Sequence, residues 1–282
     1  MRCKFPYLLL LLSCLMWAGC DDELSDSAEP RPVIEAYISQ GGTPEVFFTT
    51  SVSPSQAGEL SDVVVRWGKV TVSDGTDTVI LTGGPLKGAF PPFHYYTPMM
   101  TGKAGRTYTV TAEYNGLRAT ATATIPEATP VDSIVVRPVD GVDSLCSATL
   151  WFTAPAVTPA YYYISVLEDH PGARPLPSYL GTVSVERPGI AVSMPVYRPK
   201  YKYGAPKDYV AQLKRGARYS IALCRVEKEV YDFWNSYGSI VAFGSGSLFV
   251  NSVVRLSGNV SGGYGIFSAQ GQSKVTISTP EP

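Results

Sequence analysis

The stretch TYTVTAEYNGLRATATATI, residues 107–125, decides the fold class of this chain. Two runs flank Asn115-Gly116: the first is rich in Thr, Tyr and Val, residue types that favour strands, and the second alternates Thr with Ala. Because an Asn-Gly pair accepts the positive φ angles of a tight two-residue turn, the stretch predicts a β-hairpin. Similar β-rich runs occupy residues 33–39, 46–51, 63–73 and 78–82 before it, and 133–137, 147–154, 161–168, 181–186 and 219–226 after it.

The spacing of these runs predicts an all-β protein made of two consecutive β-sandwich domains. Seven or so strands within residues 33–126 favour an Ig-like or transthyretin-like first sandwich. Residues 126–130 read as a linker, and the second sandwich is expected over 131–282. Beyond the Gly-Ser repeat at 244–247, three more short strands are predicted at 248–256, 264–269 and 274–278.

One helix is expected, at about residues 227–237. Apolar side chains recur there at helical spacing and form a stripe on one side. We expect this stripe to pack against the second sheet. Its members are Val226, Val230, Phe233, Trp234 and Tyr237.

The first 20 residues have the pattern of an export signal. Arg2 and Lys4 precede an apolar run, residues 7–17, about half as long as a membrane-spanning helix. The run ends in Ala18-Gly19-Cys20, which resembles the lipobox of bacterial lipoproteins, with Trp17 where leucine is usual. The pattern predicts cleavage before Cys20 and lipidation of its thiol. The alternative is an ordinary secretory signal that is cut elsewhere and leaves Cys20 unmodified.

The residues after Cys20 predict a tether. Residues 21–32 hold five acidic side chains and two prolines and almost nothing that could be buried. As a flexible coil the tether would reach about 20 Å. No later stretch approaches 18 consecutive apolar residues, so we expect only acyl chains on Cys20 to hold the protein to a bilayer.

The charge of the chain argues against nucleic acid as a partner. Removal of residues 1–19 takes away Arg2 and Lys4, which leaves 21 of the 23 basic side chains against 24 acidic ones, a formal charge of −3. Binding to phosphate backbones needs a clustered basic surface on a basic domain.

The cysteines leave two alternatives open. With Cys20 acylated, Cys146 and Cys224 form an even pair that could close a disulfide in an oxidising compartment. They could equally be two separately buried thiols. Two cysteines and two histidines, His94 and His170, offer no zinc-site spacing.

No motif in the chain predicts catalysis, a metal or a cofactor. Gly-x-Ser-x-Gly, His-Glu-x-x-His and a phosphate-binding loop are all missing from the sequence. The acidic pairs at 168–169 and 227/229 are better explained by a turn and by a first helical turn. Asp140 and Asp143 are too few to cage a calcium ion and predict a solvated turn. We therefore expect a protein that is not an enzyme.

A basic, tyrosine-rich segment at residues 194–218 is the best candidate for ligand or partner binding. Seven basic side chains face one acidic residue, Asp208, and tyrosines lie between them. Tyrosines bind sugars or proteins with little loss of entropy, and the cations suit anionic glycans or an acidic receptor loop. The alternative is a solvated strand or long loop. The candidate residues are Tyr197, Arg198, Lys200, Tyr201, Lys202, Tyr203 and Lys207.

The order of these pieces resembles the Bacteroidetes lipoprotein family catalogued as domain of unknown function 4249. The resemblance is carried by the signal and the tether, together with residues 32–38, 105–110, 132–134, 231–234 and 258–269. It implies a lipoprotein on the outer face of the outer membrane, where the acidic run 21–23 would direct it. It also implies a neighbouring TonB-dependent receptor and a role in nutrient capture. The family supplies no catalytic residues.

The preferred function is therefore a non-enzymatic binding or accessory component of a TonB-dependent uptake system, with a glycan or peptide as ligand. A structural or adhesive surface protein is the second hypothesis, because fimbria-type lipoproteins of the same bacteria also join two β-sandwiches. A glycan-processing enzyme is the third, and it would need two carboxylates facing one bond.

Overall fold

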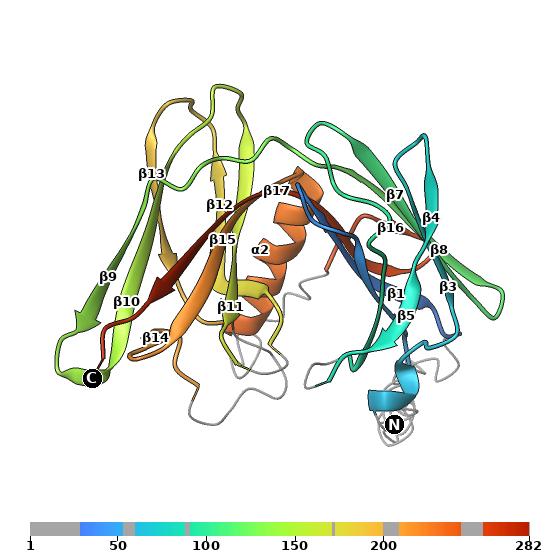
Figure 1. Ribbon diagram of the computed structural model, residues 1–282, viewed down its shortest axis with the longest axis horizontal. Coiled ribbons are helices and arrows are strands. Elements are labelled where there is room, and N and C mark those ends of the chain that lie inside the picture. The colour runs from blue at the N-terminus through green and yellow to red at the C-terminus, as the bar shows by residue number, and fades with distance from the viewer. Residues whose placement is uncertain are drawn as a thin grey trace, which may run out of the picture.

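One long strand near the C-terminus joins the two halves of the protein in the computed structural model (Figure 1). The structure describes residues 29–52, 60–87, 91–170, 173–199, 209–243 and 256–281. The predicted signal, Cys20 and most of the tether lie outside these ranges.

The described elements are strands, one short 3-10 turn and one helix. The first half contains β1 (Pro32–Ser39), β2 (Glu45–Thr50), η3 (Leu60–Val63), β3 (Lys69–Ser73), β4 (Thr78–Ile80), β5 (Thr82–Pro85), β6 (Phe93–Tyr96), β7 (Thr107–Tyr114) and β8 (Leu117–Thr124). The second half contains β9 (Ser133–Val139), β10 (Val142–Thr153), β11 (Ala160–Glu168), β12 (Leu176–Val185), β13 (Ala191–Val196), β14 (Leu213–Lys214), β15 (Arg218–Val226), α2 (Lys228–Phe243), β16 (Val260–Ser261) and β17 (Tyr264–Ser278).

These strands form three sheets. An eight-stranded sheet runs through both halves in the order β12-β11-β15-β17-β1-β2-β6-β5. A five-stranded sheet, β16-β8-β7-β3-β4, faces it in the first half, and a sheet of β13, β10, β14 and β9 faces it in the second. The mostly-β class with one helix is confirmed.

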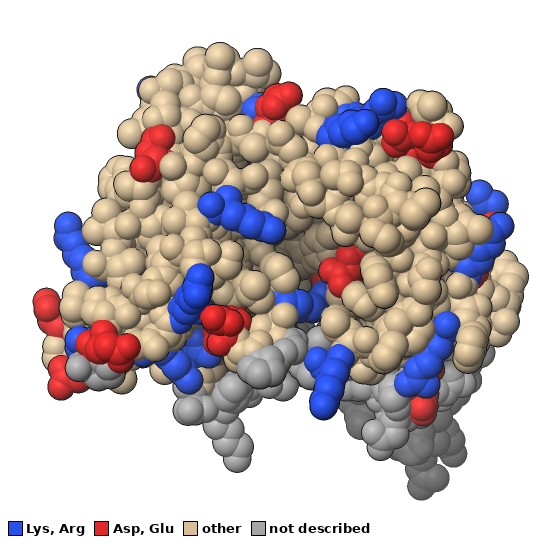
Figure 2. Space-filling view, viewed as in Figure 1, with Lys and Arg blue, Asp and Glu red and all other residues tan. Residues whose placement is uncertain are grey.

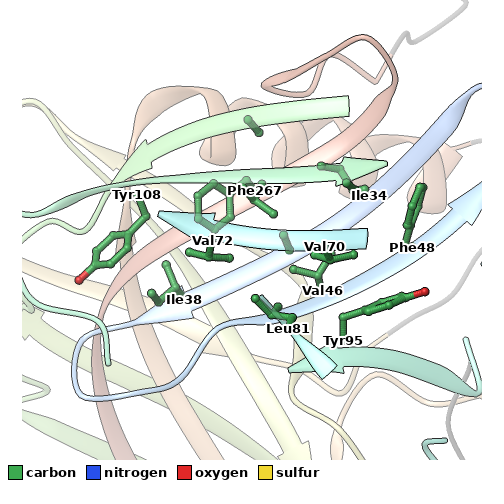
Figure 3. Packing of buried hydrophobic residues seen from close by; sticks show 14 of the residues in the cluster. Ile34, Ile38, Val46, Phe48, Val70, Val72, Leu81, Tyr95, Tyr108 and Phe267 are labelled. Atoms are coloured by element: carbon green, nitrogen blue, oxygen red, sulfur yellow. The ribbon is translucent and has the colours of Figure 1, made fainter. Parts of the chain in front are cut away.

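The first sandwich is built from alternating strands, as predicted. The hairpin β7–β8 turns at Asn115 and Gly116, whose φ angles are 47° and 78°. In β1, Ile34, Ala36 and Ile38 are completely buried while the residues between them are not. Figure 3 shows these side chains meeting those of β3, β7 and β17 between the two sheets.

The second sandwich has a separate core. Leu150 and Phe152 of β10 meet Tyr162 and Ile164 of β11 and Leu223 of β15, all of them fully buried. The rings of Phe152 and Tyr162 lie 4.7 Å apart, close enough to add an aromatic contact to the apolar burial.

Helix α2 covers the face of the eight-stranded sheet that points away from both sandwich cores. It lies between the two halves (Figure 1). It packs on the second half, as predicted, but it ends at Phe243 rather than near 237. Val241, buried one turn after Tyr237, extends the apolar stripe and explains the extra length. No helix in the described part of the chain is long and apolar enough to cross a bilayer.

The C-terminal region differs from the prediction. The two short strands predicted at 264–269 and 274–278 are one continuous strand, β17. Residues 264–270 pair in parallel with β1, and 271–278 pair antiparallel with β15. The predicted strand at 248–256 lies almost wholly outside the described residues. The two sandwiches therefore share a strand, so the C-terminal region completes the first half as well as the second.

Candidate binding cleft

A polar cleft lies on the face of the eight-stranded sheet that points away from both sandwich cores. Strand alternation creates it, because residues 35, 37 and 39 of β1 point opposite to the core residues 34, 36 and 38. Figure 2 shows the surface hollowed between the two halves. The cleft encloses about 140 Å³ and is lined by Tyr37, Ile38, Ser39, Thr43, Glu45, Tyr163, Ser165, Arg174, Pro175, Pro177, Gln270, Gln272 and Lys274.

Arg174 connects the two halves at the side of this cleft. It lies between β11 and β12, and its Nη1 donates to Oε1 of Glu35 on β1 over 3.1 Å. Its guanidinium also lies 4.3 Å from the centroid of the Phe47 ring on β2, a cation–π contact. Only 15% of the Arg174 side chain is exposed, so this ion pair is partly protected from solvent screening.

Two tyrosines contribute hydroxyl groups that stay protonated. Tyr37 donates to Oε1 of Glu35 at 2.5 Å, and Tyr163 donates to Oε1 of Gln270 at 2.6 Å. Burial raises the pKa of both phenols well above the ordinary value, and the neighbouring carboxylate of Glu35 adds to the shift. Both groups therefore act as fixed donors at neutral pH.

Other polar groups in the cleft have few protein partners among the described residues. Among the described residues, the hydroxyls of Ser39, Thr43 and Ser165 make no hydrogen bond, and the amide NH₂ of Gln270 makes none. Gln272 has only a weak contact from Nε2 to Sγ of Cys224 at 3.7 Å. Water or a ligand must satisfy these groups.

His94 forms part of the wall beside the cleft. Its Nδ1 lies 2.5 Å from Oε1 of Glu45, and its ring stacks near Phe47 and Tyr96, at 6.1 and 4.9 Å between centroids. It occupies β6, next to the edge strand β5. Its contacts join β6 to β2.

The acidic candidates at 168–169 lie in a different, shallower hollow of about 280 Å³ with His170 and Arg218. Both carboxylate oxygens of Glu168 accept from Arg198, at 2.7 and 3.1 Å. Asp140 lies in the turn between β9 and β10, as predicted, whereas Asp143 lies in β10. Among the described residues, no group of three or more His, Cys, Asp or Glu side chains could hold a metal ion.

The structure describes two of the seven residues in the predicted basic binding segment. Arg198 is bound to Glu168, and its own carbonyl accepts from the Tyr209 hydroxyl at 2.8 Å. Tyr197 bonds to Ser178 through its backbone, and its ring lies 6.2 Å from that of Tyr179. These contacts give Arg198 and Tyr197 structural roles. Lys200, Tyr201, Lys202, Tyr203 and Lys207 lie outside the described residues.

Of the two alternatives for the cysteines, the structure shows the two separately buried thiols. Cys146 and Cys224 are free and fully buried, and the disulfide alternative is wrong. Cys146 lies in the core of the second sandwich, whereas Cys224 lies on the other face of the sheet, beneath α2. The sheet itself keeps the two sulfur atoms apart.

We expect Cys224 to resist alkylation in the folded protein. Burial raises the pKa of its thiol to about 12, so at pH 8 roughly one molecule in ten thousand carries the reactive thiolate. Mass spectrometry after iodoacetamide treatment should find Cys146 and Cys224 unmodified in the native protein and both modified in guanidinium chloride. Resistance that persists in denaturant until a reductant is added would restore the disulfide.

Comparison with known proteins identifies the family. The family model described as Domain of unknown function (DUF4249) matches residues 20–276. The chain belongs to this family. The DUF4249 match includes β1 and nearly all of β17, and every residue that lines the cleft lies within it.

Other comparisons add less to the DUF4249 assignment. No curated protein matches the chain. It is similar to a segment of two fibronectin type III domains from chicken tenascin, with 14% identity, 70% of this chain and 91% of that chain covered, and a TM-score of 0.21. It is also similar to a DUF4785 family protein from Legionella pneumophila, with 11% identity, 68% of this chain and 51% of that one covered, and a TM-score of 0.22.

Proposed function

We propose that the protein is a lipoprotein of the Bacteroidetes outer membrane that faces the cell exterior and serves a TonB-dependent uptake system. In this role it binds a ligand in the cleft between its halves and contacts the receptor, and it performs no chemistry itself. The observation that carries the proposal is the set of unsatisfied hydrogen-bonding groups in a cleft built from both halves.

The charges of the cleft favour binding over catalysis. Glu35 is compensated by Arg174 and Glu45 lies against His94. Glu35 of β1 and Glu45 of β2 lie on the same face of the sheet, at diagonal positions of the strand pairing. They are therefore the two carboxylates at this cleft to consider as a catalytic pair. Glycoside hydrolysis needs one carboxyl that holds a proton and one that is free to attack. Arg174 and the Tyr37 hydroxyl both contact Oε1 of Glu35, so this carboxylate is already occupied by protein partners, which argues against that chemistry.

Two segments of the chain suit this location. Cys20 would carry the acyl chains, and the acidic residues that follow would hold the first strand, β1, clear of the membrane surface. Lys200, Lys202 and Lys207 remain the candidate contact with an acidic receptor loop, because Arg198, which borders them, is already paired with Glu168.

An affinity pull-down of the acylated protein from its own outer membrane tests the proposal. We expect one TonB-dependent receptor to co-purify and a Lys200/Lys202/Lys207→Glu variant to lose it. A variant with the same charge change at exposed positions of the first half, Arg66/Lys87/Lys103→Glu, should retain it. Polymers of the protein without any receptor would instead favour the adhesive hypothesis.

A further inference from the structure

We infer that the cleft binds a single uncharged sugar ring, recognised through Gln270 and Gln272. This inference rests on the proposed binding function and names the chemical class of its ligand. It is argued from the hydrogen-bonding groups of the cleft, its charge balance, its size and its place in the sheet.

Two glutamines on β17 point into the cleft at alternate positions. Side chains at i and i+2 of a strand are about 7 Å apart, a spacing that lets two amides contact different hydroxyls of one ring. Each amide offers donors and an acceptor, as sugar hydroxyls do. Tyr163 bonds Oε1 of Gln270, which fixes this amide with its NH₂ group available for a ligand.

The cleft is nearly balanced in charge. Arg174 is paired with Glu35, and Glu45 lies against His94. Lys274 lines the cleft without an ion-pair partner among the described residues, but it is exposed to water. Hydroxyls and amides therefore dominate the interior, and they suit an uncharged ligand better than a strongly charged one.

The size and surroundings of the cleft favour a ring over a peptide. About 140 Å³ accommodates one ring-sized group rather than a polymer. Of the strands beneath it, β11, β15, β17, β1 and β2 are paired on both sides. The edge strand β12 reaches the cleft through Pro177, and a proline has no N–H to donate to an added peptide strand. The apolar faces of Tyr37, Tyr163, Pro175 and Pro177 can contact the C–H face of a sugar.

Isothermal titration calorimetry on the acylated protein tests this inference. The protein is kept in lauryldimethylamine oxide, because this detergent carries no sugar. The probes are D-glucose, D-galactose, D-mannose and N-acetyl-D-glucosamine, with D-glucuronate and triglycine as comparison ligands. We expect at least one neutral sugar to bind and Gln272→Leu to weaken it at least tenfold. Tyr163→Phe should weaken it several-fold, because it frees Gln270 but retains the contact with Trp234 at 6.0 Å.

Thr276→Val is the matched control, because Thr276 is on the same face of the same strand but outside the cleft. It should bind as the unchanged protein does. The inference is overturned if no neutral sugar binds, or if triglycine binds instead. It is also overturned if D-glucuronate binds more tightly than every neutral sugar and the Lys274→Gln substitution removes this difference in affinity. If the receptor still co-purifies in any of these cases, the ligand class is wrong and the proposed function is not.

Discussion

Gly265→Ala is expected to lower the free energy of unfolding by about 3 kcal/mol or more. Gly265 has a φ of +116°, a conformation that L side chains rarely adopt. A Cβ there would lie 1.8 Å from the carbonyl oxygen of Ile34, its partner in the β1–β17 pairing. Because the obstacle is backbone, the two strands would have to separate. Guanidinium denaturation followed by tryptophan fluorescence measures the loss.

Gly75→Ala separates the two causes. Gly75 has a φ of +85° in the turn between β3 and β4, and nothing lies within 4 Å of an added Cβ. It should cost only the conformational strain, about 1 kcal/mol. An equal loss at both positions would mean that the close approach of β1 to residue 265 contributes nothing.

Local patterns predicted most of the fold. The Asn115-Gly116 turn, the alternation in β1 and the stripe on α2 each depend on residues close together in the sequence, so each is visible without a structure. The path of β17 is not local. Its pairing with β1 joins residues 33–39 to residues 264–270. A local sequence pattern cannot predict which strand so far away in the sequence will pair in parallel. Gly271 and Ser273 interrupt the apolar residues at alternate positions between Ala269 and Val275, which explains why two short strands were predicted.

The cleft was only partly visible in the sequence. Glu35 and Tyr37 alternate with buried residues on β1, so these polar side chains away from the core could have been found. On β17 residues 266–271 are all buried, Gln270 among them, so no such alternation marks the glutamines. Their meeting at one place depends on the β1–β17 pairing. Arg174 carries no sequence signal, because its role comes from contacts with Glu35 and Phe47 in the other half. The basic segment at 194–218 was predicted to bind a ligand or partner from its composition alone. Composition does not reveal that Arg198 forms an ion pair with Glu168.

Phe267→Ala and Leu223→Ala are expected to lower the stability of the whole protein through one shared unfolding transition. Phe267 is buried in the first core and Leu223 in the second, so the substitutions should cost about 3–5 and 2–5 kcal/mol. Two sandwiches joined only by a linker would unfold separately, and each substitution would affect its own half. Here β17 pairs with β1 and with β15, so neither half keeps its eight-stranded sheet when the other unfolds.

Differential scanning calorimetry compares the two variants with the unchanged protein. Each should show a single peak at a lower temperature, with the calorimetric enthalpy equal to the van't Hoff enthalpy. Trp67→Ala is the control, because the Trp67 side chain is 90% exposed and its loss should change stability by less than about 0.5 kcal/mol. Two peaks, with Phe267→Ala moving one and Leu223→Ala the other, would mean that the halves are independent domains. The cleft would then lie between two units free to move apart, and Arg174, with its contacts to Glu35 and Phe47, would have to hold it closed.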